Sequence, residues 1–144
     1  YLDLSYEKKK IPKDKIIEMQ KKKTGKLFSF CCAAPAIIKN KNNKEIEFFE
    51  DIGLNIGLLF QIADDLIDFR GDSKKAGKKT GKDQKKGKAT LISLLGYANA
   101  IKYCNKITLD VNKNLKKYGS NFKNIKETLN YILNREKWHK ITNF

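Results

Sequence analysis

The sequence predicts an all-α protein. Hydrophobic residues recur at helical spacing along most of the chain, alternating strand patterns are scarce, and only 2 prolines occur in 144 residues. This length, with 40% hydrophobic residues, is enough for one domain with its own core but short for two. We therefore expect residues 1–144 to form one helical packing unit, without an internal repeat or a linker between domains.

The first predicted helix spans residues 12–34. Its first residue, Pro12, suits a first helical turn, where the missing N–H would have no partner in any case. Pro35 and the polar run KNKNNK, residues 39–44, interrupt the pattern and predict a loop. The stripe at helical spacing mixes polar with apolar residues: Ile16, Ile17, Gln20, Lys23, Thr24, Leu27, Phe28 and Cys31.

A second helix is predicted from about Glu45 to Phe69. From Ile56 onward it is apolar around much of its circumference, which is typical of a helix inside a bundle. Residues 73–90 carry three glycines with lysines between them and almost no apolar side chain, so they predict a surface loop. The apolar positions of the helix are Ile46, Phe49, Ile52, Ile56, Leu59, Phe60, Ala63 and Ile67.

Helical periodicity resumes at Leu91 and continues as far as Tyr118, as one helix or two. Gly96 lies inside this pattern, where glycine weakens a helix. Gly119 is expected to close it as a C-terminal cap. A last helix carries the evenly spaced residues Phe122, Ile125, Leu129 and Ile132.

The chain is strongly basic, with 31 Lys and Arg against 16 Asp and Glu and a formal net charge of +15. Such a charge attracts nucleic acid, anionic lipid or phosphorylated small molecules, and does not choose among them. Nearly all of the basic residues are lysines and asparagine is abundant, so compositional drift explains much of the excess equally well.

The cysteines and the hydropathy exclude several other classes. Cys31, Cys32 and Cys104 lack CxxC spacing and the chain has 1 His, which argues against a zinc site or a disulfide framework. No apolar run is long enough for a signal core or a bilayer span. The prediction is a soluble protein of the reducing cytoplasm, without stable membrane insertion.

An acidic cluster lies in the apolar second helix, in the stretch FQIADDLIDFRGD. Asp64 and Asp68 share a helix face, Asp65 lies about 100° round from Asp64, and Gln61 precedes them by one turn. Unpaired buried carboxylates are costly, so these must be exposed, paired with lysines or bound to cations. Oxygen ligands without a nearby His or Cys suit Mg²⁺, with Mn²⁺ as the alternative.

The loop that follows supplies the complementary charge. Carboxylates hold Mg²⁺, whereas ammonium and backbone N–H groups hold phosphate oxygens, and together they form the two halves of a diphosphate site. The simpler alternative is a solvated helix end that nearby lysines neutralise.

The motifs in series resemble the trans-isoprenyl diphosphate synthases, most closely the bacterial-type farnesyl diphosphate synthases. GLLFQIADDLIDFRGD followed by GKKTGKDQKKGKATL is similar to the second aspartate-rich region and its lysine loop. KKKTGKLF, residues 21–28, is similar to the Lys-Thr helix of that family. YLDL and YILNRE resemble a segment after the first aspartate-rich region and the C-terminal end. The resemblance implies an isoprenoid synthase-type helical bundle.

The resemblance also implies a reaction. Enzymes of this family are trans-prenyltransferases: an allylic diphosphate ionises with the help of Mg²⁺, and the carbocation is attacked by isopentenyl diphosphate. The expected substrates are isopentenyl diphosphate and dimethylallyl or geranyl diphosphate, and the expected product is farnesyl diphosphate. A geranylgeranyl or longer-chain polyprenyl diphosphate synthase is the alternative, and the enzyme is expected to be a homodimer.

Site roles follow from the resemblance residue by residue. Asp64 and Asp68 would hold Mg²⁺, with Asp65 supporting the metal cluster. Lys23 and Lys78 would contact diphosphate oxygens, and Lys88 would assist. Thr24 and Gln61 would place oxygen atoms near the developing cation. Lys23 also has a simpler reading as a solvated lysine, and Thr24 as a helix residue bonded to its own backbone.

The chain departs from the family pattern in one respect: no first aspartate-rich region is present, and neither are the basic residues that hold isopentenyl diphosphate. We therefore expect residues 1–144 to correspond to the C-terminal half of a synthase subunit, incomplete for catalysis without the N-terminal half. A basic helical nucleic-acid-binding module is the alternative from another class. It is disfavoured because no recognition helix or aromatic stacking pattern adjoins the lysine loop.

Overall fold

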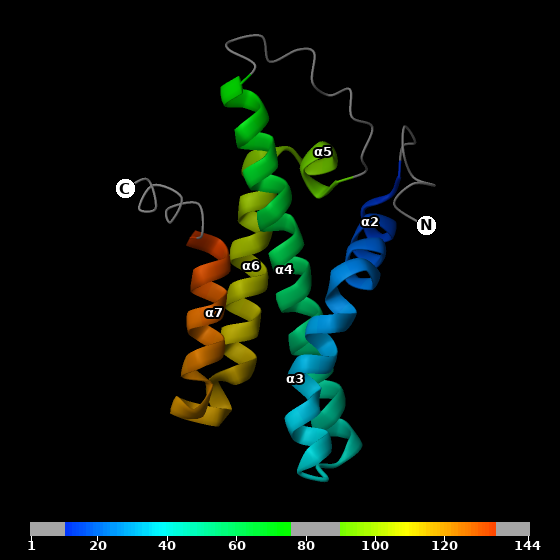
Figure 1. The fold of residues 1–144 in the computed structure, drawn as a ribbon, viewed down its shortest axis with the longest axis vertical. Coiled ribbons are helices and arrows are strands. Elements are labelled where there is room, and N and C mark those ends of the chain that lie inside the picture. Colours follow the sequence, from blue (N-terminus) through cyan, green and yellow to red (C-terminus); the bar gives the residue numbers. More distant parts are fainter. Residues whose placement is uncertain (1–10, 76–89, 135–144) are drawn as a thin grey trace.

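The computed structural model describes residues 11–75 and 90–134, with side chains described for 11–69 and 90–134. Every regular element within these ranges is a helix, which confirms the all-α prediction (Figure 1). The elements are α2 (Lys13–Gln20), the π-helical turn η1 (Lys21–Gly25), α3 (Lys26–Ile38), α4 (Asn43–Lys75), α5 (Leu91–Leu95), α6 (Tyr97–Leu115), the 3₁₀ segment η3 (Lys116–Phe122) and α7 (Lys123–Asn134).

Helix α4 is the central element of the fold. The continuous run α2–η1–α3 lies along one side of it, and α6 and α7 lie along the other (Figure 1). Asn42 caps the start of α4, because its side-chain oxygen accepts a hydrogen bond from the Glu45 backbone N–H at 2.9 Å. The fully buried side chains at the centre of the core come from α2, α4, α5, α6 and α7: Ile16, Ile52, Leu58, Leu59, Ile62, Leu91, Cys104, Val111, Leu115 and Leu129.

The turn η1 shifts the buried face of the first helical run. Before η1, the buried Ile16 and Gln20 lie on the predicted stripe, with the buried Met19 beside it. From Gly25 onward the buried residues lie off the stripe. Leu27 is 68% exposed and Cys31 is also exposed, whereas Ser29 and Ala33 are buried. A π-helical turn contains one more residue than an α-helical turn, which rotates all later side chains. The predicted stripe was therefore wrong for Leu27 and Cys31, whereas Phe28 packs against the core as predicted.

Two glycines allow α3 and α4 to approach closely. A Cβ atom at Gly57 would lie 2.6 Å from the Cα atom of Gly25, and a Cβ atom at Gly53 would collide with the Phe28 carbonyl oxygen. Real Cβ atoms do not tolerate such distances, so both positions need glycine. The backbone of η1 thus rests directly on the backbone of α4.

Several predicted boundaries were wrong. Pro35 lies inside α3, which ends three residues later at Ile38. The second helix begins two residues earlier than predicted and continues to Lys75, which includes the start of the predicted loop. Pro35 cannot donate a backbone hydrogen bond to the carbonyl of Cys31, four residues earlier, yet α3 continues through it. Asn40, with φ 50°, provides the left-handed residue just after the end of α3.

Gly96 and Gly119 both take positive φ values, and Gly96 alone of the two has a different role from the one predicted. Gly96, with φ 79°, separates α5 from α6 instead of lying within one helix. Thr90 and Ser93 form a capping box that starts α5. Gly119, with φ 63° and ψ −136°, is the non-helical residue inside η3, so it breaks the helical run directly after Tyr118, as predicted.

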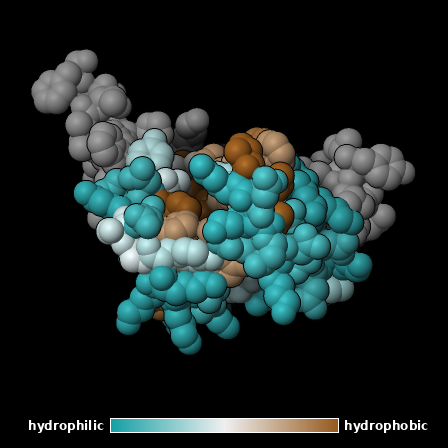
Figure 2. Space-filling model, turned by 90° about the horizontal axis from the view of Figure 1, so that it is seen from below, coloured by the Kyte–Doolittle hydropathy of each residue, from teal (hydrophilic) through white to brown (hydrophobic). Residues whose placement is uncertain are grey.

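An aromatic cluster holds the start of α4 against η3. The Phe49 and Phe122 rings stack with centroids 5.7 Å apart, and Tyr118 contacts both. Seen from this end of the molecule, hydrophilic side chains cover most of the surface and hydrophobic ones show between them (Figure 2). Among the described residues, no helix has the length and apolar character to cross a bilayer.

Candidate active site

A chain of hydrogen bonds connects the α2–η1 segment to α4. Thr24 Oγ1 donates to Gln61 Oε1 at 3.0 Å. Gln61 Nε2 donates to Asp65 Oδ1, and Gln20 Nε2 donates to Asp65 Oδ2, both at 3.3 Å. Two pairs of residues that are 37 and 45 positions apart in the sequence are therefore brought together at this point of the fold.

Local structure explains why these side chains meet. Gln61 and Asp65 are four residues apart on α4 and so share a helix face. Gln20 directly precedes the π-helical turn and Thr24 lies within it, and the contact between Gly25 and Gly57 holds that turn against α4. The close backbone approach lets short side chains reach across.

Asp65 sets the direction of the whole chain of hydrogen bonds. An ionised carboxylate can only accept, so Gln61 must turn its Nε2 towards Asp65. The Gln61 oxygen then faces Thr24, and the Thr24 hydroxyl must donate its proton to it. The lone pairs of the Thr24 oxygen remain available for another group.

The electrostatics of Asp65 are unusual. Burial raises its pKa from 3.8 to about 6, against the opposing effect of the hydrogen bond from Gln61. The Asp64 charge also raises this pKa, while the hydrogen bond from Gln20 and the charge of Lys23 lower it. Lys23 and Asp64 thus act on the same half-buried carboxylate from η1 and from α4.

The sequence profile of the polyprenyl synthetase family matches residues 1–132 of this chain. The chain belongs to the polyprenyl synthetase family.

Individual relatives agree with this assignment. The chain is 33% identical to a farnesyl diphosphate synthase of Micrococcus luteus over 136 residues, which are 94% of this chain and 47% of the relative. A crystal structure of an FPP/GFPP synthase from Zymomonas mobilis matches with a TM-score of 0.74 and 34% identity, over 91% of this chain and 42% of that one. The resemblance and the isoprenoid synthase fold expected from the sequence are both confirmed.

A third comparison concerns ligands. A Helicobacter pylori geranyltransferase, described as complexed with magnesium and isoprenyl diphosphate, matches with a TM-score of 0.68 and 27% identity, over 93% of this chain and 44% of that one. This chain spans less than half the length of each of these relatives.

In this polyprenyl synthetase chain, the three aspartates of the acidic cluster differ in exposure and in hydrogen bonding. Asp64 and Asp68 are exposed on the same face of α4, whereas Asp65 is half-buried and both of its oxygens accept hydrogen bonds from amides. Among the described residues, no three His, Cys, Asp or Glu side chains converge on one point as a metal site requires. The joint role of Asp64, Asp65 and Asp68 at a metal stays a prediction.

The donor chemistry nevertheless fits Mg²⁺. Asp64 and Asp68 offer carboxylate oxygens on one exposed face without a sulfur or imidazole ligand beside them, and Mg²⁺ commonly takes one or two carboxylates and fills its remaining positions with water and phosphate oxygens. The two carboxylates can supply the protein share of such a site.

The predicted lysines are only partly accounted for. Lys23 lies on η1 next to Thr24, with an exposed side chain. Lys78 and Lys88 lie outside the described residues, so their diphosphate contacts stay a prediction. Of the predicted site residues, Lys23, Thr24, Gln61 and Asp65 come together in the structure.

Sequence reasoning missed one member of the site. Gln20 belongs to the predicted apolar stripe, but no role was assigned to it. It is only 3% exposed, although three lysines follow it directly. A glutamine on an apolar stripe one turn before a Lys-Thr pair is the signal that could have identified it.

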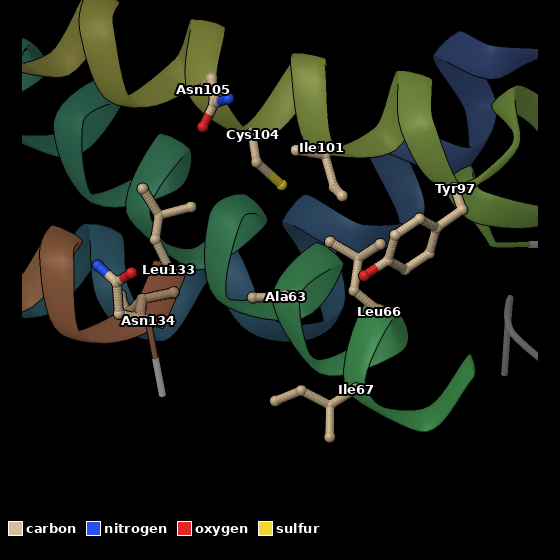
Figure 3. Close-up of a pocket in the computed structure, with 10 residues that line it drawn as sticks. Ala63, Leu66, Ile67, Tyr97, Ile101, Cys104, Asn105, Leu133 and Asn134 are labelled. Atoms are coloured by element: carbon tan, nitrogen blue, oxygen red, sulfur yellow. The ribbon is translucent and has the colours of Figure 1, made fainter. Parts of the chain in front are cut away.

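One cavity of the described residues lies on another side of α4. It has a volume of about 240 Å³ and lies between α4, α6 and α7, where Ala63 and Leu66 face Ile101 and Cys104 (Figure 3). Burial raises the pKa of Cys104 to about 11, so this thiol is not a reactive nucleophile near neutral pH. None of the predicted site residues that the structure describes lines this cavity.

Proposed function

We propose that this chain forms the Mg²⁺-diphosphate side of a prenyl diphosphate synthase. The enzyme would condense isopentenyl diphosphate with dimethylallyl or geranyl diphosphate to give farnesyl diphosphate. Family membership supports this reaction class. The observation that carries the proposal is the hydrogen-bonded chain Thr24–Gln61–Asp65, because it joins the Lys-Thr motif to the aspartate-rich motif.

The first task of the site is to bind the allylic diphosphate. When bound, Mg²⁺ would neutralise charge that develops on the leaving diphosphate. Asp64 and Asp68 would hold the metal, and Asp65 would support them from the half-buried layer behind. Lys23 and Lys78 would contact the diphosphate oxygens as point charges, with Lys88 in a supporting role.

The second task is to stabilise the allylic cation without trapping it. Since the Thr24 proton is directed to Gln61, the Thr24 oxygen presents lone pairs to the substrate side. A neutral hydroxyl oxygen stabilises positive charge through its dipole and is a weak nucleophile without a base beside it. Gln61 would act mainly by orienting this hydroxyl, since its own oxygen is already an acceptor for Thr24.

Completion of the active site needs groups that this chain lacks. We propose that the chain acts together with the N-terminal half of a synthase subunit, which would supply the first aspartate-rich region and the isopentenyl diphosphate site, and that the subunit forms a homodimer. The relatives support a prenyl diphosphate product but differ in its length, since one is a farnesyl diphosphate synthase and another an FPP/GFPP synthase. Farnesyl diphosphate is our proposed product, with longer chains as the alternative outcome.

The test compares two substitutions on α4 in a complete subunit that contains this chain. Asp64→Ala removes a proposed metal ligand, and Asp51→Ala removes an exposed carboxylate of the same helix as a matched control. We expect Asp64→Ala to lower Mg²⁺-dependent synthesis from geranyl and isopentenyl diphosphates by more than about 100-fold, since even residues behind a metal ligand are worth about 10–100-fold. Asp51→Ala should leave it nearly unchanged, and urea unfolding should differ little between the two variants.

Unimpaired Mg²⁺-dependent synthesis by Asp64→Ala would refute the assignment. Salt-dependent binding of the wild-type protein to duplex DNA, without Mg²⁺-dependent binding of diphosphate, would instead favour a nucleic-acid-binding function. Chromatography of the products distinguishes farnesyl diphosphate from longer chains.

A further inference from the structure

Gln20 is a buried polar side chain with an incomplete set of hydrogen bonds. It ends α2 and is 3% exposed. Its Nε2 donates to Asp65 Oδ2 at 3.3 Å, while its Oε1 is buried without a hydrogen-bond partner. The opposite orientation of the amide would place Oε1 against the Asp65 carboxylate, so the observed one is electrostatically preferred.

Packing alone does not explain a glutamine at this position. A buried acceptor without a partner carries a desolvation penalty, and methionine has nearly the same shape without polar atoms. The neighbouring Met19, also buried, shows that an apolar side chain is accommodated in this part of α2. The amide of Gln20 therefore serves its polar contact with Asp65.

That contact differs from the one that Gln61 makes. Gln61 reaches Asp65 within one helix, four residues away, whereas Gln20 reaches it from a different helix. With one amide on each oxygen, the plane of the Asp65 carboxylate is fixed from two directions. The charges of Asp64 and Asp65 interact, so the position in which Gln20 and Gln61 hold the Asp65 carboxylate affects the electrostatic potential at Asp64.

We propose that Gln20 is a positioning residue for the metal-diphosphate site: its Nε2 holds the Asp65 carboxylate in place across the contact between α2 and α4. This inference rests on the proposed function. It assigns Gln20 a role that acts through Asp65, without contact with the substrate.

The test measures binding of Mn²⁺ in the presence of inorganic diphosphate, by electron paramagnetic resonance, to the complete subunit that contains this chain. The variants are Gln20→Met, Asp65→Asn and the double variant, with Met19→Leu as the matched buried control. We expect Gln20→Met to weaken Mn²⁺ binding by about 10-fold or more. Met19→Leu should bind as the wild type does, and the unfolding midpoint of Gln20→Met should shift by no more than about 4 °C.

The double variant separates positioning from general structural support. If Gln20 acts through Asp65, Gln20→Met should add no further loss of Mn²⁺ affinity to Asp65→Asn. Unchanged affinity in Gln20→Met, or fully additive losses in the double variant, would overturn the inference. If the wild-type protein itself fails to bind Mn²⁺ with diphosphate, the proposed function fails, and that outcome differs visibly from failure of the Gln20 variants alone.

Discussion

The two sides of α4 are packed in opposite ways. On the side of η1 and α3, Gly57 brings backbone against backbone, and a single added carbon has no room. On the side of α6 and α7, large side chains meet around a cavity of about 240 Å³, lined by Ala63 among others (Figure 3). The same helix therefore has one face defined by its backbone and one defined by its side chains.

The two sides of α4 therefore differ in how much change in helix spacing or side-chain size they accept. The hydrogen bonds from Thr24 to Gln61 and from Gln20 to Asp65 depend on the close backbone approach. A shift of about 1 Å between the helices would break them, since hydrogen bonds weaken beyond about 3.5 Å. The cavity side carries no such constraint, because side chains can repack.

The largest loss of stability should come from a methyl group added on the side of α4 that faces η1. Gly57→Ala would place Cβ 2.6 Å from the Cα atom of Gly25, so the helices must separate. We expect a loss of about 3 kcal/mol in the free energy of unfolding, measured by urea denaturation. Gly25→Ala is the control, since its Cβ would meet the movable Leu54 side chain at 3.3 Å and should cost much less. Equal costs for the two variants would mean that the backbone contact does not limit the packing.

A smaller effect is expected from the Asp65 charge in the absence of metal. With a folded pKa of about 6 against 3.8, the folded protein binds the proton more tightly, so the ionised carboxylate lowers stability above pH 6. This cost disappears as the pH falls from about 6 to 4. Asp65→Asn removes the charge, so its stability relative to the wild type should be higher at pH 7.5 than at pH 4.5, by about 1–2 kcal/mol after allowance for partial solvent screening.

Urea denaturation at both pH values measures this difference. A stability difference between Asp65→Asn and wild type that does not change between pH 4.5 and 7.5 would contradict the raised pKa.

The smallest effect should come from added carbon on the cavity side. Ala63→Val places two more carbons beside the cavity, and the gain from filling space offsets the lower helix propensity of valine. We expect the free energy of unfolding to change by no more than about 1 kcal/mol. A loss as large as that of Gly57→Ala would show that the two faces of α4 are equally intolerant.

The angular positions of the site residues on α4 could be predicted from the sequence, but their contacts with residues of other helices could not all be predicted. Gln61, Asp64, Asp65 and Asp68 were placed correctly relative to one another, because a regular helix fixes the angle between any two of its residues. The partnership of Thr24 with Gln61 depends on how two helices pack. That packing depends on Gly57, whose role is visible only when its neighbour is known.

The π-helical turn explains the main error in the predicted fold. A period of 3.6 residues predicted Leu27 and Cys31 on the buried face, and one additional residue per turn in η1 moved them outward. Nothing in KKKTG distinguishes a π-helical turn from an α-helical one by composition. Gln20 was overlooked for a related reason: its partner Asp65 is 45 residues away, and no local pattern connects the two.

The turn η1 also sets the packing of this segment against its own hydrophobic pattern. In a regular α-helix, Leu27 and Cys31 would face α4, and hydrophobic burial of Leu27 favours that arrangement. In the observed register Leu27 and Phe30 are 68% and 64% exposed, and Gly25 meets Gly57 instead. Burial of Leu27 thus favours one rotation of α3 about its own axis, whereas the contacts of Gly25 with Gly57 and of Thr24 with Gln61 require another. The segment that carries Lys23 and Thr24 is a point of frustration in the folding landscape, resolved in favour of the arrangement that brings Thr24 to Gln61.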